Sequence, residues 1–160
     1  MTDAAQLLDL ARARGVMIAT AESCTGGMIA AAITDVPGSS DVFERGFVTY
    51  SNAAKREMLG VRADSLSGHG AVSTLVAREM AEGALARSAA QLALSVTGIA
   101  GPGGSGLKPE GRVCFGLAQT GRKPRVETVD FGPLGRAGVR QATVAHALNL
   151  LAGALLDEGQ

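Results

Sequence analysis

The sequence has no tryptophan, only five aromatic residues, and two cysteines, Cys24 and Cys114, that lie far apart in the chain. Two distant cysteines exclude a disulfide framework and a thiolate-rich zinc site. No apolar run approaches the roughly 18–20 residues that cross a bilayer. Basic and acidic residues number 15 each, so the chain lacks the basic excess that nucleic-acid binding usually requires. These absences argue against nucleic acid and membrane as partners.

Hydrophobic residues and glycine are plentiful. The 160 residues are 46% hydrophobic and include 22 glycines, about twice the usual share of ~7%. A chain of this length buries roughly 68–70% of its unfolded surface, so we expect a single globular domain over residues 1–160. The first residues, Met1-Thr2-Asp3, lack a basic segment followed by an apolar one, which predicts a cytoplasmic, reducing location.

Helical and strand patterns alternate in the first part of the chain, and two strand patterns follow one another later. Asp3 and Gln6 form a capping-box pattern, Gly15 ends that helix, and Ser51 or Asn52 and Ser73 can cap further helices. Together they predict an α/β layered fold with a mixed central sheet. The expected helices are 4–14, 28–33, 52–59, one that Ser73 caps and that includes residues 76–85, and 136–155. The expected strands are 16–19, 46–50, 92–96, 112–120 and 125–131.

The segment Thr20–Gly27 follows the first predicted strand and precedes a helix. A serine in such a turn lies at the carboxyl edge of a sheet, as in a nucleophile elbow, although the letters do not match G-x-S-x-G. The N-terminus of the following helix could attract an anion or a developing oxyanion. Ser23 is therefore a candidate nucleophile and the adjacent Cys24 its rival. Alternatively, Ser23 or Thr25 merely caps the helix.

Tyr50 ends a predicted strand, and Lys55 falls in the first turn of the helix that follows. Helical side chains lean toward the N-terminus, so Lys55 could reach back toward Tyr50. The helix dipole disfavours a cation there and would help to lower the pKa of the lysine, as a neutral base requires. The alternative is a solvated lysine beside a half-buried tyrosine.

A loop rich in glycine follows the strand at 92–96. Residues 97–111 contain six glycines and two prolines, and they match neither a Walker A loop nor a dinucleotide fingerprint. Loops of this length are functional or disordered, and glycine lets backbone N–H groups approach a phosphate. A binding loop and a plain mobile loop both fit this pattern.

The two histidines give no catalytic or metal constellation. His69 and His146 lie away from carboxylates at ligand spacing, and no Ser-His-Asp triad or metal motif can be assembled. His146 falls on the apolar side of the last predicted helix and is expected to be a satisfied core residue. Cys114 lies in the middle of a strand and is expected in the core.

Together these segments resemble the CinA C-terminal domain family, whose members include nicotinamide mononucleotide amidohydrolases. The resemblance runs from about residue 5 to 155. The stretches that carry it occur in the family's order: Thr20-Ala-Glu-Ser-Cys-Thr-Gly-Gly27, Gly46-Phe-Val-Thr-Tyr-Ser-Asn52 with Lys55, Gly70-Ala-Val-Ser73, and Thr97-Gly-Ile-Ala-Gly-Pro102 with Lys108-Pro109.

The resemblance implies a three-layer α/β/α sandwich that deamidates nicotinamide mononucleotide without a metal or redox cofactor. It implies that Ser23 is the nucleophile and that Lys55 is the base, directly or through Tyr50. The substrate-binding residues would then come from the turn and the glycine loop: Cys24, Thr25, Gly26, Gly27, Thr97, Gly98, Ala100, Gly101 and Gly103.

The chain departs from the family pattern at two places. Relatives often have Gly-Asp-Arg before the last helix, whereas this chain reads Gly132-Pro-Leu-Gly-Arg136, so Arg136 or Arg140 could substitute there. After Lys108-Pro109, relatives often have a small apolar residue, then Gly and Thr, whereas this chain has Glu110-Gly111-Arg112.

A different class of function stays open from the sequence alone. The family's association with competence and DNA damage would also fit a non-catalytic nucleotide-binding or interaction module, and another small amide could replace nicotinamide mononucleotide as substrate. The expected partner is a small-molecule nucleotide. Small-residue helices and an apolar last helix would suit a homodimer.

Overall fold

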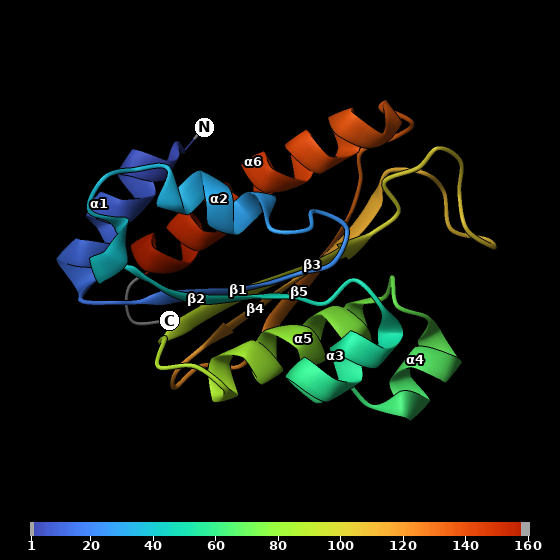
Figure 1. The fold of residues 1–160 in the computed structure, drawn as a ribbon, viewed down its shortest axis with the longest axis horizontal. Coiled ribbons are helices and arrows are strands. Elements are labelled where there is room, and N and C mark those ends of the chain that lie inside the picture. Colours follow the sequence, from blue (N-terminus) through green and yellow to red (C-terminus); the bar gives the residue numbers. More distant parts are fainter. Residues whose placement is uncertain (1, 158–160) are drawn as a thin grey trace.

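The computed structural model describes residues 2–157 and contains a five-stranded sheet in the order β2-β1-β3-β4-β5 (Figure 1). β1 runs parallel to both β2 and β3, whereas β3–β4 and β4–β5 are antiparallel. The mixed sheet confirms the predicted class. The strands are β1 (Ile18–Glu22), β2 (Phe43–Val48), β3 (Leu92–Gly98), β4 (Arg112–Gln119) and β5 (Arg125–Asp130).

Helices cover both faces of the sheet and complete three layers (Figure 1). On one face lie α1 (Ala4–Arg14), α2 (Met28–Thr34) and the long α6 (Gly135–Leu156). On the other lie α3 (Asn52–Leu59), α4 (Ala63–His69) and α5 (Thr74–Ala86), and a short 3-10 helix, η1 (Ser39–Asp41), precedes β2. A separate apolar core fills each space between sheet and helices.

The predicted helix boundaries are confirmed at several ends because their capping chemistry is local. Asp3 and Gln6 form the expected capping box, and Ser51 and Ser73 accept hydrogen bonds from backbone N–H groups of the first turns that follow them. Gly15 and Gly60 end α1 and α3 in the left-handed conformation.

Two strand predictions are displaced, and one helix was not predicted. β1 covers Ile18–Glu22 rather than 16–19, because Thr20 and Glu22 are buried strand residues and not part of the turn. β2 covers Phe43–Val48 rather than 46–50. The unpredicted helix is α4, whose first residues are fastened by Glu79 of α5 through the backbone N–H of Arg62 and the Ser65 hydroxyl.

Close packing of α5 accounts for two of the many glycines. A Cβ at Gly83 would lie 2.0 Å from the carbonyl oxygen of Leu59, and one at Gly116 would lie 2.3 Å from the carbonyl oxygen of Ala77. Neither backbone atom could move aside cheaply. Glycine therefore lets α5 pack tightly between α3 and the sheet.

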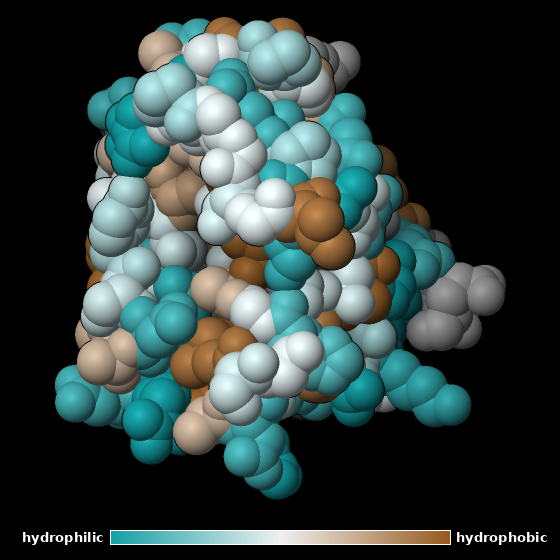
Figure 2. Space-filling view, turned by 90° about the vertical axis from the view of Figure 1, so that its right-hand side faces the viewer, coloured by the Kyte–Doolittle hydropathy of each residue, from teal (hydrophilic) through white to brown (hydrophobic). Residues whose placement is uncertain are grey.

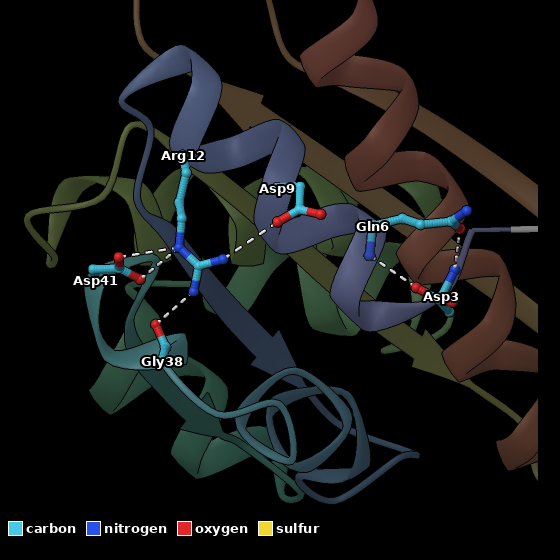
Figure 3. Close-up of polar contacts among 6 residues, drawn as sticks. All are labelled: Asp3, Gln6, Asp9, Arg12, Gly38 and Asp41. Atoms are coloured by element: carbon cyan, nitrogen blue, oxygen red, sulfur yellow. Dashed lines mark hydrogen bonds and ion pairs between the residues drawn. The ribbon is translucent and has the colours of Figure 1, made fainter.

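Arg12 fastens α1 to the connection that leads into β2 (Figure 3). Its guanidinium donates to both carboxylate oxygens of Asp41, at 3.2 and 3.1 Å, and to the carbonyl of Gly38 at 2.8 Å. It also lies 3.5 Å from Asp9. These exposed contacts hold the segment that positions β2 beside β1.

His146 and Cys114 lie where the sequence predicted. His146 bonds Glu127 at 2.5 Å and packs against the rings of Phe115 and Phe131, so it is a satisfied histidine between α6 and the sheet. Cys114 is buried in β4.

Candidate functional site

Ser23 lies immediately after β1, in the turn that leads to α2, and is 8% exposed. Its backbone N–H donates to the carbonyl of Val96 at 3.1 Å, so the neighbouring strand β3 fixes the start of the turn. Parallel strands β1 and β2 end at the same edge of the sheet, and the segment after β2 therefore arrives beside Ser23.

The carboxylate of Glu22 stabilises the turn between β1 and α2. It is 1% exposed and accepts hydrogen bonds from the Thr25 hydroxyl at 2.5 Å and from the backbone N–H groups of Ile29 and Ala30 at 2.9 and 3.0 Å. Glu22 thus satisfies the N-terminus of α2, the position at which the sequence suggested that an anion could bind. The anion at this helix N-terminus is therefore a side chain of the protein itself, and the amides of Ile29 and Ala30 do not face a substrate.

Replacement of Glu22 by alanine is expected to destabilise the fold strongly. Three buried donors would lose their acceptor, which costs about 2–4 kcal/mol in the free energy of unfolding. Glu22→Gln retains one acceptor oxygen and should lose less. Urea unfolding of both variants, with exposed Glu57→Ala as control, checks this order, and equal stability of Glu22→Ala and wild type would contradict it.

Lys55 is buried although it is charged in its ordinary state, with 1% of its surface exposed. Its Nζ lies 2.9 Å from Ser23 Oγ, 3.0 Å from the carbonyl oxygen of Thr49 and 3.3 Å from that of Tyr50. Carbonyl oxygens only accept, so they fix two N–H bonds of the amine. The remaining direction of Nζ faces Ser23, and in the neutral amine that direction holds the lone pair.

Burial lowers the pKa of Lys55 below its ordinary value of 10.5. A thiolate at Cys24 would oppose this shift, but burial also raises the pKa of the Cys24 thiol to about 11. Cys24 is therefore an uncharged thiol near neutral pH, and its side chain packs with the apolar core. A lysine with a lowered pKa beside a serine hydroxyl fits a general base next to its nucleophile.

Tyr50 presents its side chain to the outside, with 61% of it exposed. Its hydroxyl accepts a hydrogen bond from Arg136 Nη2 at 2.7 Å, and only its backbone carbonyl contacts Lys55. Among residues 2–157 no hydrogen bond joins the Tyr50 hydroxyl to Ser23 or Lys55.

The glycine-rich loop after β3 projects from the sheet edge (Figure 1) and is held at its base. The Thr97 hydroxyl donates to the carbonyl of Ala71 at 2.9 Å. Lys108 Nζ donates to the carbonyls of His69 and Val72 at 2.7 and 2.6 Å, which ties the loop to the connection between α4 and α5. These contacts attach both ends of the loop to the connection between α4 and α5.

Two arginines of α6 reach the site. Arg140 braces the Ser23 turn by donating to the carbonyls of Cys24 and Thr25 at 3.2 and 3.3 Å. Arg136 donates to the carbonyl of Gly101 at 2.7 Å as well as to Tyr50. Arg136 and Arg140 lie in or near the stretch Gly132-Pro-Leu-Gly-Arg136, where this chain departs from the family pattern. That departure was the only indication in the sequence that either arginine belongs to the site.

A cavity of about 690 Å³ joins these elements. It contains all three predicted catalytic residues and most of the predicted binding residues: Ser23, Tyr50, Lys55, Cys24, Thr97, Gly98, Ala100, Gly101 and Gly103. Thr25, Gly26 and Gly27 do not line it, since they lie in the turn behind Ser23, and their binding role stays a prediction. Sequence reasoning assigned no role to four further lining residues, Asn52, Gly70, Ala71 and Val72, and named Arg136 only as a residue that could substitute at the departure from the family pattern.

The face at the loop end of the molecule is mixed in hydropathy (Figure 2). Hydrophobic residues there form small areas separated by hydrophilic ones. Large contiguous apolar patches are typical of protein docking sites. The face in this view presents instead small hydrophobic areas interspersed with hydrophilic ones.

A buried serine–lysine pair at the carboxyl edge of an α/β sheet is an arrangement that can support nucleophilic catalysis by an enzyme. Residues 2–155 match the family described as CinA C-terminal domain, and the chain belongs to this family. None of the helices between residues 2 and 157 has the length and apolar character that a bilayer crossing requires.

Relatives of this chain differ in length. It is 52% identical over 141 residues to the nicotinamide-nucleotide amidohydrolase PncC of Escherichia coli K12, covering 88% of this chain and 85% of that protein. It is 61% identical over 120 residues to a CinA-like protein of Chlorobium phaeobacteroides, covering 73% of this chain but only 29% of that protein. The chain therefore spans under a third of the length of that relative.

Solved structures share the fold. The competence/damage inducible protein CihA of Agrobacterium tumefaciens is 48% identical, with a TM-score of 0.92 over 96% of this chain and 93% of that one. This likeness confirms the three-layer α/β/α arrangement.

Proposed function

We propose that this protein hydrolyses the carboxamide of nicotinamide mononucleotide to give nicotinic acid mononucleotide and ammonia. The observation that carries the proposal is the 2.9 Å contact between Ser23 Oγ and the buried Lys55 Nζ inside the cavity. The similarity to the amidohydrolase of Escherichia coli, which extends over most of both chains, supports this choice of amide.

In the first step Ser23 Oγ attacks the carboxamide carbon while its proton passes to the lone pair of Lys55 Nζ. The carbonyls of Thr49 and Tyr50 hold the amine in place and accept from the ammonium that forms. Direct transfer fits the geometry, since no second side chain stands between the two atoms. A positioned base of this kind contributes about 10²–10⁴-fold to the rate.

The oxyanion of the tetrahedral intermediate requires nearby N–H donors. The amide of Gly26 already donates to the carbonyl of Ser23 at 3.1 Å. The amide of Thr25 makes no hydrogen bond within the described part of the chain, which leaves it for the oxyanion. One such donor is worth about 3–4 kcal/mol in other oxyanion holes.

Collapse of the intermediate breaks the C–N bond, and the Lys55 ammonium returns its proton to the departing nitrogen, which leaves as ammonia. The acyl group remains as an ester on Ser23 Oγ. A water molecule then attacks this ester and gives a proton to Lys55. As the ester C–O bond breaks, Lys55 returns that proton to Ser23 Oγ, the carboxylic acid leaves, and both side chains regain their starting protonation.

The rest of the cavity suits a phosphorylated ligand. Its volume of about 690 Å³ lies in the ordinary range for small-molecule sites. Among the described residues that line it there is no aspartate or glutamate, whereas Arg136 and Lys108 contribute positive charge.

Tyr50→Phe distinguishes direct transfer from a relay through the tyrosine. Because the hydroxyl contacts Arg136 and not the serine–lysine pair, kcat is expected to stay within about threefold of wild type, while KM rises as Arg136 loses one partner. Steady-state measurement of ammonia release separates the two constants. A kcat reduced by two orders of magnitude would assign the proton transfer to Tyr50.

The proposal is tested by supplying nicotinamide mononucleotide, nicotinamide riboside and free nicotinamide to the purified protein and measuring ammonia. Turnover of the mononucleotide, with much less for the two amides that lack phosphate, is the expected result. Turnover of another amide alone would change the substrate. A folded protein that binds the mononucleotide without turnover would support the non-catalytic nucleotide-binding module.

A further inference from the structure

Glu110 joins the glycine-rich loop to the start of α6. Its Oε1 accepts a hydrogen bond from the backbone N–H of Gly103 at 2.7 Å, and its Oε2 accepts one from the backbone N–H of Gly135 at 3.0 Å. The carboxylate also lies against Gly101, where a Cβ would approach it to 2.6 Å. One side chain thus contacts the loop at two points and the first residue of the helix.

The next residue of α6 makes a second connection to the same loop. Arg136 donates to the carbonyl of Gly101 at 2.7 Å and to the hydroxyl of Tyr50, also at 2.7 Å. Glu110, Gly135, Arg136 and Gly101 therefore form a closed ring of contacts, of which Gly101 and Arg136 line the cavity. Glycine at 101 and 103 makes the loop backbone intrinsically free, so these contacts determine where it lies.

We propose that Glu110 is a positioning residue for substrate binding, which acts by holding the loop and Arg136 in the arrangement that forms one wall of the cavity. Hydrogen bonds to an ionised carboxylate are roughly twice as strong as neutral ones, and this carboxylate makes two.

The kinetic test rests on the proposed function. In Glu110→Ala the loop and Arg136 lose their common support, and KM for nicotinamide mononucleotide is expected to rise roughly tenfold or more while kcat stays within about threefold. Glu110→Gln keeps one acceptor oxygen and should fall between. Glu82→Gln, an exposed acid of α5 outside the cavity, is the matched control and should resemble wild type.

A double-mutant cycle separates positioning from a general loss of structure. If Glu110 acts through Arg136, the effect of Arg136→Ala on KM is large in the wild-type background and small in Glu110→Ala. Additive effects, or a fall in kcat with unchanged KM, would overturn the proposal.

A second measurement does not depend on any activity. In ¹⁵N-labelled protein the backbone amides of Gly103 and Gly135 should exchange with solvent roughly tenfold faster or more in Glu110→Ala than in wild type, because both lose their acceptor. If wild type does not hydrolyse the mononucleotide, the proposed function fails while these exchange rates still decide the role of Glu110. Unchanged exchange of both amides in Glu110→Ala would overturn it.

Discussion

Ser23→Ala is expected to lower the turnover of nicotinamide mononucleotide by roughly 10³-fold or more, since the reaction loses the atom that forms the acyl intermediate. Ser23 Oγ contacts Lys55 and lies in the cavity, and no strand or helix depends on it. The variant should therefore fold normally. Ammonia release at saturating substrate, together with circular dichroism and a thermal unfolding curve, measures both properties.

The serine control for this experiment is Ser67→Ala on the exposed surface of α4, which should match wild type in rate. Retained activity in Ser23→Ala would indicate that the neighbouring Cys24 is the nucleophile. The buried, uncharged thiol argues against that outcome, because the pKa of Cys24 is raised to about 11 and little thiolate exists near neutral pH. In wild type, rapid mixing should also reveal an acyl intermediate by mass.

Lys55→Met is expected to abolish turnover to a similar extent, because no other described side chain can accept the Ser23 proton. Methionine has a similar length and suits a buried site, so the fold should persist. The control is Lys123→Met, a lysine exposed in the turn between β4 and β5. A normal rate in Lys55→Met would remove Lys55 from the mechanism.

The lowered pKa of Lys55 gives this prediction a pH dependence. Only the neutral amine can accept the serine proton, so kcat should rise with pH and level off above a pKa that lies below 10.5. Between that pKa and the unfolded value, the native state binds fewer protons than the unfolded state. The free energy of unfolding of wild type relative to Lys55→Met therefore rises with pH through that interval, and at neutral pH the methionine variant should be at least as stable.

Helix ends were predictable from the sequence because their signals are local. Asp3 with Gln6, Ser51 and Ser73 bond to residues within one turn, and no tertiary information is needed to read them. α4 shows the opposite case. Its sequence, Ala-Asp-Ser-Leu-Ser-Gly-His, contains weak helix formers, and Glu79, distant in sequence, fastens its first turn.

The sequence allowed the prediction of the main site residues, but not of the residues that hold them in place. Ser23, Lys55 and the glycine loop stand in recognisable local patterns. Glu22 resembled an ordinary turn residue, because its burial depends on three donors that α2 and Thr25 bring to it. Arg136 and Arg140 lie far along the chain from most of the site. The residues around them in the sequence do not indicate which backbone carbonyls they bind.

The place of β1 in the sheet bears on how the protein is made. β1 pairs with β3 in parallel, and its residue Ile18 lies beside Leu92, 74 positions later. During synthesis, β1 cannot pair with β3 until the residues beyond 92 have been made. Pairing between strands this far apart in the sequence slows folding. The backbone of Ser23 is fixed by Val96 of that same strand. A ribosome-bound chain that ends before β3 would therefore carry Ser23 and Lys55 without being able to hold them in a working arrangement.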